Sequence, residues 1–114
     1  MSKTLFERII DREIEADIVL ETERIIAFND ISPQAPTHIL IVPKKVISSL
    51  NELEEEDRDL IGEMFIVAKN IAEEKGISEN GYRTIFNTND YGGQTVYHLH
   101  LHLIGGRKMT WPPG

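Results

Sequence analysis

Three of the four histidines in this chain lie at alternate positions of the run His98-Leu99-His100-Leu101-His102. Because successive side chains of a β-strand point to opposite faces, a strand here would place all three imidazoles on one face and the leucines on the other. The imidazoles would then start roughly 6.5–7 Å apart along that face. The spacing therefore predicts a row of three imidazoles backed by an apolar face.

Three interpretations of this row differ in their chemistry. The histidines could simply fill the polar side of a half-buried strand, but neighbouring imidazoles disfavour each other's protonation and add no evident stability. They could bind zinc, because neutral imidazole is a good ligand, although the motif itself contains no Asp or Glu to complete a site. They could instead attack phosphorus, since a neutral imidazole nitrogen is a good nucleophile and departs readily as an imidazolium.

The residues before the motif favour attack at phosphorus. That chemistry needs one ring whose far nitrogen donates to a fixed acceptor, donors for the phosphoryl oxygens, and a proton source for the leaving group. The run Gly92-Gly93-Gln94-Thr95 supplies flexible backbone, an amide and a hydroxyl, and Asn87 supplies a second amide. We therefore expect a phosphoryl-binding site beside the three histidines.

Composition limits the classes of protein to consider. A chain of 114 residues with 40% hydrophobic and 27% charged residues fits one globular domain, residues 1–114. A net charge of −7 argues against sequence-independent binding to nucleic acid, but a local cluster of donors can still bind one phosphate. The absence of cysteine excludes disulfides and thiolate metal sites. Without an apolar stretch of about 20 residues or a secretory-type leader, we expect a cytoplasmic protein that is not in a membrane.

The elements that must position the histidines are readable from local patterns. Thr4-Leu5-Phe6-Glu7 has the form of a capping box and predicts a short helix ending near Arg12. Apolar residues at three- and four-residue spacing from Leu60 to Ala72 predict one long helix, which Lys75-Gly76 ends. The acidic run before it favours the helix dipole and needs no catalytic role.

Strand-like runs account for the rest of the domain. We expect strands at residues 18–20 and 24–28 as a hairpin, then at 37–42, 82–86 and 96–104, the last carrying the histidines. Residues 29–36, 87–94 and 105–114 are rich in turn formers and are expected to be irregular. The prediction is an α+β domain: an antiparallel sheet of about five strands with one long helix and a short N-terminal helix.

The histidine run resembles the signature of a known family. His98-Leu99-His100-Leu101-His102-Leu103-Ile104 is similar to the His-φ-His-φ-His-φ-φ motif, with φ apolar, of the histidine triad superfamily. The similarity extends from about Leu5 to Gly114 and points to the histidine triad nucleotide-binding branch. The segments that carry it are Asp30–His38, Val42–Lys45, Gly92–Gln94 with Val96–His98, and Trp111–Gly114.

This resemblance implies a homodimeric purine nucleoside phosphoramidase that needs no cofactor or metal. Such a hydrolase cleaves the P–N bond of adenosine or guanosine monophosphate (AMP or GMP) amides and amine adducts, and in some cases acyl adenylates. His100 would be the nucleophile that forms a nucleotidyl-imidazole intermediate, with the backbone carbonyl of His98 fixing its tautomer. His102, Asn87 and Gln94 would bind the phosphoryl group. Thr95 would contact the phosphate or the leaving group through its hydroxyl, and His38 would close the site from the side.

The resemblance also implies a nucleoside pocket. Asp30 would accept from the ribose hydroxyls, although it could equally be an Asx-turn residue. The base would lie among apolar side chains, several of which could equally be plain core: Phe6, Ile9, Ile14, Ile18 and Ile31. In the family the C-terminal tail, here with Trp111, reaches toward the partner's site.

Two departures from the family pattern concern the same pocket. Thr95 replaces a serine that many relatives carry, which keeps the hydroxyl and stiffens its rotamer. Asn29 replaces a histidine found in some relatives beside the ribose. The alternative function is a nucleotide-binding or scaffold protein whose catalysis is incidental.

Overall fold

The computed structural model describes residues 2–114, and its chain begins with the predicted short helix. Helix α1 spans Leu5–Ile10. Thr4 Oγ1 accepts from the Glu7 N–H at 3.0 Å, and Glu7 Oε1 accepts from the Thr4 N–H at 2.9 Å. This reciprocal pair is the predicted capping box, and it satisfies two backbone donors that the first helical turn leaves free.

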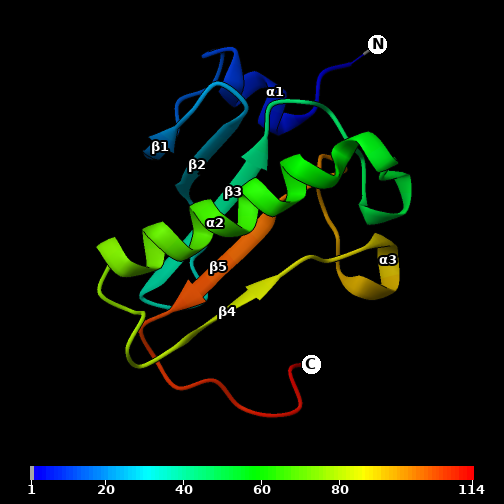
Figure 1. The fold of residues 1–114 in the computed structure, drawn as a ribbon. Coiled ribbons are helices and arrows are strands. Elements are labelled where there is room, and N and C mark those ends of the chain that lie inside the picture. The colour runs from blue at the N-terminus through cyan, green and yellow to red at the C-terminus, as the bar shows by residue number, and fades with distance from the viewer. Residues whose placement is uncertain (1) are drawn as a thin grey trace.

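Five strands form one antiparallel sheet. They are β1 (Ile18–Glu21), β2 (Ile25–Asn29), β3 (Thr37–Pro43), β4 (Tyr82–Ile85) and β5 (Leu101–Gly105). Their order across the sheet is β1-β2-β3-β5-β4, so the last strand in the chain lies between β3 and β4 (Figure 1). The predicted α+β class and the five-stranded antiparallel sheet are confirmed.

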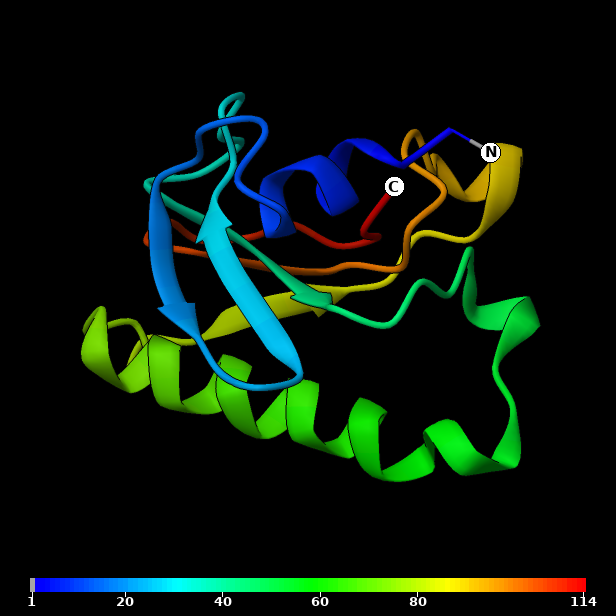
Figure 2. The same ribbon diagram turned by 90° about the horizontal axis from the view of Figure 1, so that it is seen from above.

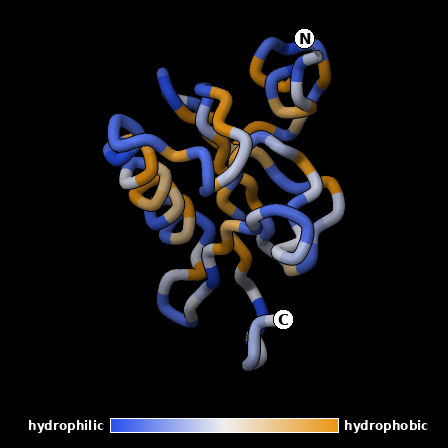
Figure 3. The backbone as a smooth tube through the Cα atoms, turned by 90° about the vertical axis from the view of Figure 1, so that its right-hand side faces the viewer, coloured by the Kyte–Doolittle hydropathy of each residue, from blue (hydrophilic) through white to orange (hydrophobic). Residues whose placement is uncertain are grey.

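The two faces of the sheet are covered by different helices. The long helix α2 (Arg58–Glu74) packs on one face, and α1 lies on the other (Figure 2). Along β2 the side chains alternate accordingly: Ile25 and Ala27 join the core with α2, whereas Ile26 and Phe28 join the cluster with α1. Apolar segments run through the central strands, while hydrophilic residues dominate the outer loops (Figure 3).

The strand that carries the histidines starts later than predicted. We expected a strand from residue 96 to 104, but β5 begins at Leu101, and residues 96–98 bend instead. The ladder with β3 ends at the pair Ile41–Leu101, and Pro43, two residues further along β3, has no N–H with which to extend it. The Leu99 N–H donates to the carbonyl of Ile47 at 2.6 Å instead. The leucines nevertheless all enter the core under α2: Leu99, Leu101 and Leu103.

Short helical segments were not predicted. Two 3-10 turns precede α2, at Leu50–Glu52 and Glu55–Asp57. A four-residue helix, α3 (Asn89–Gly92), interrupts the region predicted as loop before the histidines. None of the helices within residues 2–114 has the length and apolar character that crossing a bilayer demands.

Replacing Leu101 by alanine should lower the free energy of unfolding by about 2–5 kcal/mol, because it leaves a cavity that the rigid sheet and α2 fill only in part. Leu101 is fully buried between neighbouring strands and α2. Urea unfolding measures the loss. Val46→Ala is the control, because Val46 is 48% exposed and its truncation should cost far less. Equal losses in the two variants would contradict this assignment of the core.

Candidate active site

The geometry of His100 defines its tautomer. His100 is buried, and its Nδ1–H donates to the backbone carbonyl of His98 at 2.7 Å. A carbonyl can only accept, so the proton lies on Nδ1 and a neutral ring leaves Nε2 with a free lone pair. Burial lowers the pKa of His100, which keeps the ring neutral near neutral pH. Phe6 packs edge-on against the ring, with centroids 4.9 Å apart.

A second chain of hydrogen bonds orients His102. The Gln34 backbone N–H donates to His38 Nδ1 at 3.0 Å, so His38 carries its proton on Nε2. His38 Nε2 lies 2.9 Å from His102 Nδ1 and donates to it. His102 therefore carries its own proton on Nε2, and this buried N–H has no partner within residues 2–114. A buried donor left unpaired is costly unless a ligand accepts from it.

These two imidazoles open onto a pocket of about 230 Å³ on the α1 side of the sheet. Most of its wall is apolar, and the rings of His100 and His102 lie 4.9 Å apart at one end. The structure brings eight of the predicted site residues together on this wall: Phe6, Ile9, Ile14, Asp30, Ile31, Thr95, His100 and His102. Wall residues that were not predicted as binding residues are Leu5, Glu15, Ala16, Phe28, Asn29, Leu40 and Val96.

The carboxylate of Asp30, on the pocket wall, contacts two neighbouring residues. Its Oδ1 accepts from the Ser32 N–H at 2.8 Å, which is the Asx turn considered above. Its Oδ2 lies 3.4 Å from His38 Nε2. The carboxylate is thus held in place by backbone on one side and stands beside the His38–His102 pair on the other.

Five predicted site residues do not line this pocket. His98 and His38 lie behind the two pocket imidazoles, and Ile18 lines a neighbouring depression with Ile9 and Ile14. Gln94 donates both amide hydrogens, to the carbonyls of Ser48 and Val96, and accepts from the Asn89 N–H. Asn87 is half-buried just before α3.

One residue was predicted only as a helix cap and has a further contact. Thr4 Oγ1 lies 2.8 Å from His98 Nδ1. The sequence signal for Thr4 was local, since it marked a helix start and carried no information about a residue 94 positions later in the chain.

Comparison with known proteins places the chain in a family. A family model of the HIT domain matches residues 11–109. The chain belongs to the HIT family. The "Purine nucleoside phosphoramidase" of Escherichia coli K12 is 53% identical over 107 residues, which cover 94% of this chain and 90% of that protein.

Solved structures of HIT proteins agree with the fold. A HIT family hydrolase from Legionella pneumophila superposes with a TM-score of 0.96 at 54% identity, covering 98% of this chain and all of that one. A histidine triad protein from Clostridium difficile gives 0.91 at 40% identity, over 96% and 97% of the two chains. Because these matches span both chains nearly end to end, this HIT protein shares the whole domain with them.

Three side chains of this HIT protein come close enough to hold a metal ion. The candidate ligand atoms of Asp30, His38 and His102 all lie within 4.8 Å of one another. A metal on His38 Nε2 would require that nitrogen to lose its proton to Nδ1, which already faces the Gln34 N–H. Two donors would then oppose each other, so the hydrogen bonds favour a donor relay over a metal centre.

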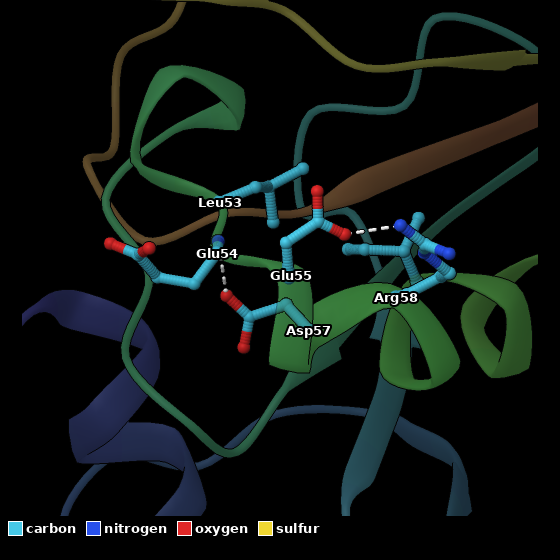
Figure 4. Close-up of a pocket in the computed structure, with 6 residues that line it drawn as sticks. Leu53, Glu54, Glu55, Asp57 and Arg58 are labelled. Carbon is cyan, nitrogen blue, oxygen red and sulfur yellow. Dashed lines mark hydrogen bonds and ion pairs between the residues drawn. The ribbon is translucent and has the colours of Figure 1, made fainter.

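A larger pocket of this HIT protein, about 530 Å³, lies at the start of α2 (Figure 4). Its polar side chains bond within the chain: Asp57 accepts from the Glu54 N–H at 2.9 Å and from Lys45 at 2.5 Å, and Glu55 pairs with Arg58. The acidic run therefore forms hydrogen bonds and ion pairs that stabilise the beginning of α2, and it needs no catalytic role. We assign no chemistry to this pocket.

The free energy of unfolding should fall as the pH is lowered from about 6.5 toward about 4. Burial, followed by neighbouring His100 and His38, lowers the pKa of His102 from 6.5 to about 4. In this interval His102 binds a proton in the unfolded chain but not in the folded chain, so lowering the pH favours unfolding. Urea unfolding at several pH values measures the slope. His102→Gln should have a shallower slope, and equal slopes would contradict the assignment.

Proposed function

We propose that this chain hydrolyses the P–N bond of purine nucleoside monophosphate amides and amine adducts, and in some cases acyl adenylates, through a nucleotidyl-His100 intermediate. The observation that carries the proposal is the bond between His100 Nδ1–H and the His98 carbonyl. It leaves a neutral Nε2 with its lone pair free, beside the unpartnered N–H of His102. The 53% identity to the E. coli phosphoramidase supports the choice of reaction.

The first step forms one bond to phosphorus and breaks another. Nε2 of His100 attacks the phosphorus and the P–N bond breaks. The exposed Thr95 hydroxyl gives its proton to the departing amine and regains one from solvent. His102 Nε2–H donates to a phosphoryl oxygen whose negative charge grows in the transition state. Water then attacks the phosphorus and loses a proton to solvent, the bond between phosphorus and Nε2 breaks, and the nucleoside monophosphate leaves with neutral His100 restored.

The pocket wall supports a nucleoside substrate. In this proposal the purine lies against the apolar side chains near α1, and Asp30 accepts from the ribose hydroxyls. Asn87 and Gln94 would help to bind the phosphoryl group through the loop that they shape, and Ile18 would extend the apolar wall beyond Ile14. His38 contributes through His102 rather than by touching the substrate.

Turnover of an adenosine phosphoramidate, followed by release of the amine, tests the reaction directly. Acid quenching during turnover should trap a nucleotidyl adduct, and peptide mass spectrometry should locate it on His100. The guanosine analogue and an acyl adenylate define the substrate range, and a chelator should leave the rate unchanged. If AMP binds but no amide is cleaved, the chain is a nucleotide-binding or scaffold protein instead.

We also propose that the protein is a homodimer. Strand β4 is an edge of the sheet, with one side of its backbone free to pair. Near it, Phe65 of α2 is 42% exposed and packs against Phe86, and Ile66 is 58% exposed. The tail lies beside the same strand: Arg83 donates to the Thr110 carbonyl and stands over the 82% exposed ring of Trp111.

Dimerisation through this edge would take each tail toward the partner's site. Sedimentation of the wild type should give a dimer, and Ile66→Asp should shift it toward monomer; a wild-type monomer would overturn the proposal. The cytoplasm is the proposed location, and cell fractionation tests it.

A further inference from the structure

The side chain of His98 is the one member of the histidine motif that the proposed chemistry leaves unused. It is fully buried and does not line the pocket, and the hydrogen bond to His100 comes from its backbone carbonyl. Yet both ring nitrogens are bonded. Nε2 lies 2.8 Å from the Pro43 carbonyl, and Nδ1 lies 2.8 Å from Thr4 Oγ1. The ring thus joins the end of β3 to the start of α1.

The direction of each hydrogen bond follows from the groups involved. The carbonyl of Pro43 can only accept, so His98 carries its proton on Nε2. Burial lowers the pKa of His98, which keeps the ring neutral and Nδ1 an acceptor. Thr4 Oγ1 already accepts from the Glu7 N–H, so its own proton is free to go to Nδ1. One continuous network runs from Glu7 through Thr4 and His98 to Pro43.

We propose that Thr4 is a positioning residue for the reaction at His100, an inference that rests on the function proposed above. The Thr4 hydroxyl proton holds the neutral His98 ring in one orientation. The carbonyl of that same residue then stays where it accepts from His100 Nδ1, so Nε2 of His100 points its lone pair into the pocket. Thr4 touches neither substrate nor reacting atoms and acts only through His98.

The need for such an anchor follows from the backbone around the motif. His98 and His100 lie outside β5, so the ladder that holds Leu101–Gly105 does not extend to the orienting carbonyl. The Leu99 N–H bond to Ile47 holds the backbone at one point. The two ring bonds of His98 supply the remaining constraint, one from each side.

The same contact ties the pocket wall to the nucleophile. Thr4 is the N-cap of α1, and the next turn carries Phe6, which packs against both His98 and His100 with centroid distances of 5.9 and 4.9 Å. A helix that moved away from the triad would therefore lose the Thr4 bond and the Phe6 packing together.

A purely structural role for Thr4, as a helix cap, makes a different prediction, and substitutions separate the two. Thr4→Ser keeps the hydroxyl. Thr4→Gly caps the helix almost as well as threonine but has no proton to give to His98. Thr4→Val loses both functions. Glu7→Ala is the matched control, because it removes the other bond of the capping box and leaves the Thr4–His98 bond intact.

In kinetics with an adenosine phosphoramidate, activity should depend on whether residue 4 has a hydroxyl proton, and not on how well that residue caps the helix. In Thr4→Gly and Thr4→Val we expect kcat to fall about tenfold to a hundredfold, the cost typical of a misplaced reacting group, with KM changed far less. Thr4→Ser and Glu7→Ala should stay near wild type. Wild-type kcat in Thr4→Gly would overturn the inference.

Nuclear magnetic resonance of 15N-labelled histidines tests the same network without turnover. Wild-type His98 should carry a proton on Nε2 alone, and His100 on Nδ1 alone. The His100 Nδ1–H signal should persist in Thr4→Ser and broaden or vanish in Thr4→Gly and Thr4→Val. A wild-type His98 protonated on Nδ1, or an unchanged His100 signal in all variants, would overturn the role of Thr4. Because this measurement needs no substrate, it decides the inference even if the wild type cleaves no phosphoramidate.

Discussion

Replacing His100 by alanine should abolish turnover of an adenosine phosphoramidate, with a loss in kcat of at least about 10⁴-fold, because the covalent route then has no nucleophile. Truncation removes a ring that packs against Phe6 but leaves Asp30 and the rest of the apolar wall in place. AMP should therefore still bind. Single-turnover kinetics and calorimetric titration with AMP measure the two quantities separately.

A second variant at this position distinguishes loss of the nucleophile from loss of the folded pocket. His100→Gly leaves space for an imidazole molecule beside the phosphorus, so added imidazole should restore part of the turnover. Undiminished turnover in His100→Ala would refute the nucleophile. Loss of AMP binding together with turnover, with no rescue in His100→Gly, would instead point to a collapsed pocket.

Replacing His102 by alanine should give the second largest loss, about 10²–10³-fold in kcat, the cost of removing one donor to a developing negative charge. His102 Nε2–H is the buried donor that lacks a partner within residues 2–114, and it lies beside the nucleophile's ring. Because the donor acts mainly in the transition state, KM should change much less than kcat.

Substitution of His38 separates the donor role of His102 from its packing. His38→Gln can still place an amide N–H near His102 Nδ1 and should retain much of the rate, whereas His38→Leu leaves that nitrogen without a donor. A rate in His102→Ala equal to that of wild type would show that the unpaired N–H is not used in catalysis. Comparable losses in His38→Gln and His38→Leu would argue against the relay.

Much of this protein was readable from local sequence patterns. The capping box at Thr4 and Glu7 needs only four residues, and both hydrogen bonds are present. Alternation of apolar residues placed Leu99 and Leu103 in the core, and helical spacing located α2. These features depend on side-chain periodicity and on backbone groups within one turn, which local sequence specifies. The family signature added the function class, which the alternation of histidines alone left open between zinc and phosphorus chemistry.

What tertiary structure decided is how the histidines are held. Strand β5 starts at Leu101, where its pairing with β3 ends opposite Ile41, a fact of pairing that neither segment reveals alone. The proton positions on the rings depend on groups that are distant in the chain. Gln34 and His38 set the proton of His102, which lies 64 residues after His38. Thr4 bonds to the ring of His98. A neutral imidazole can carry its proton on either ring nitrogen until a fixed donor or acceptor selects one. The sequence specified the three rings, and only the folded chain determined which nitrogen of each is free to react.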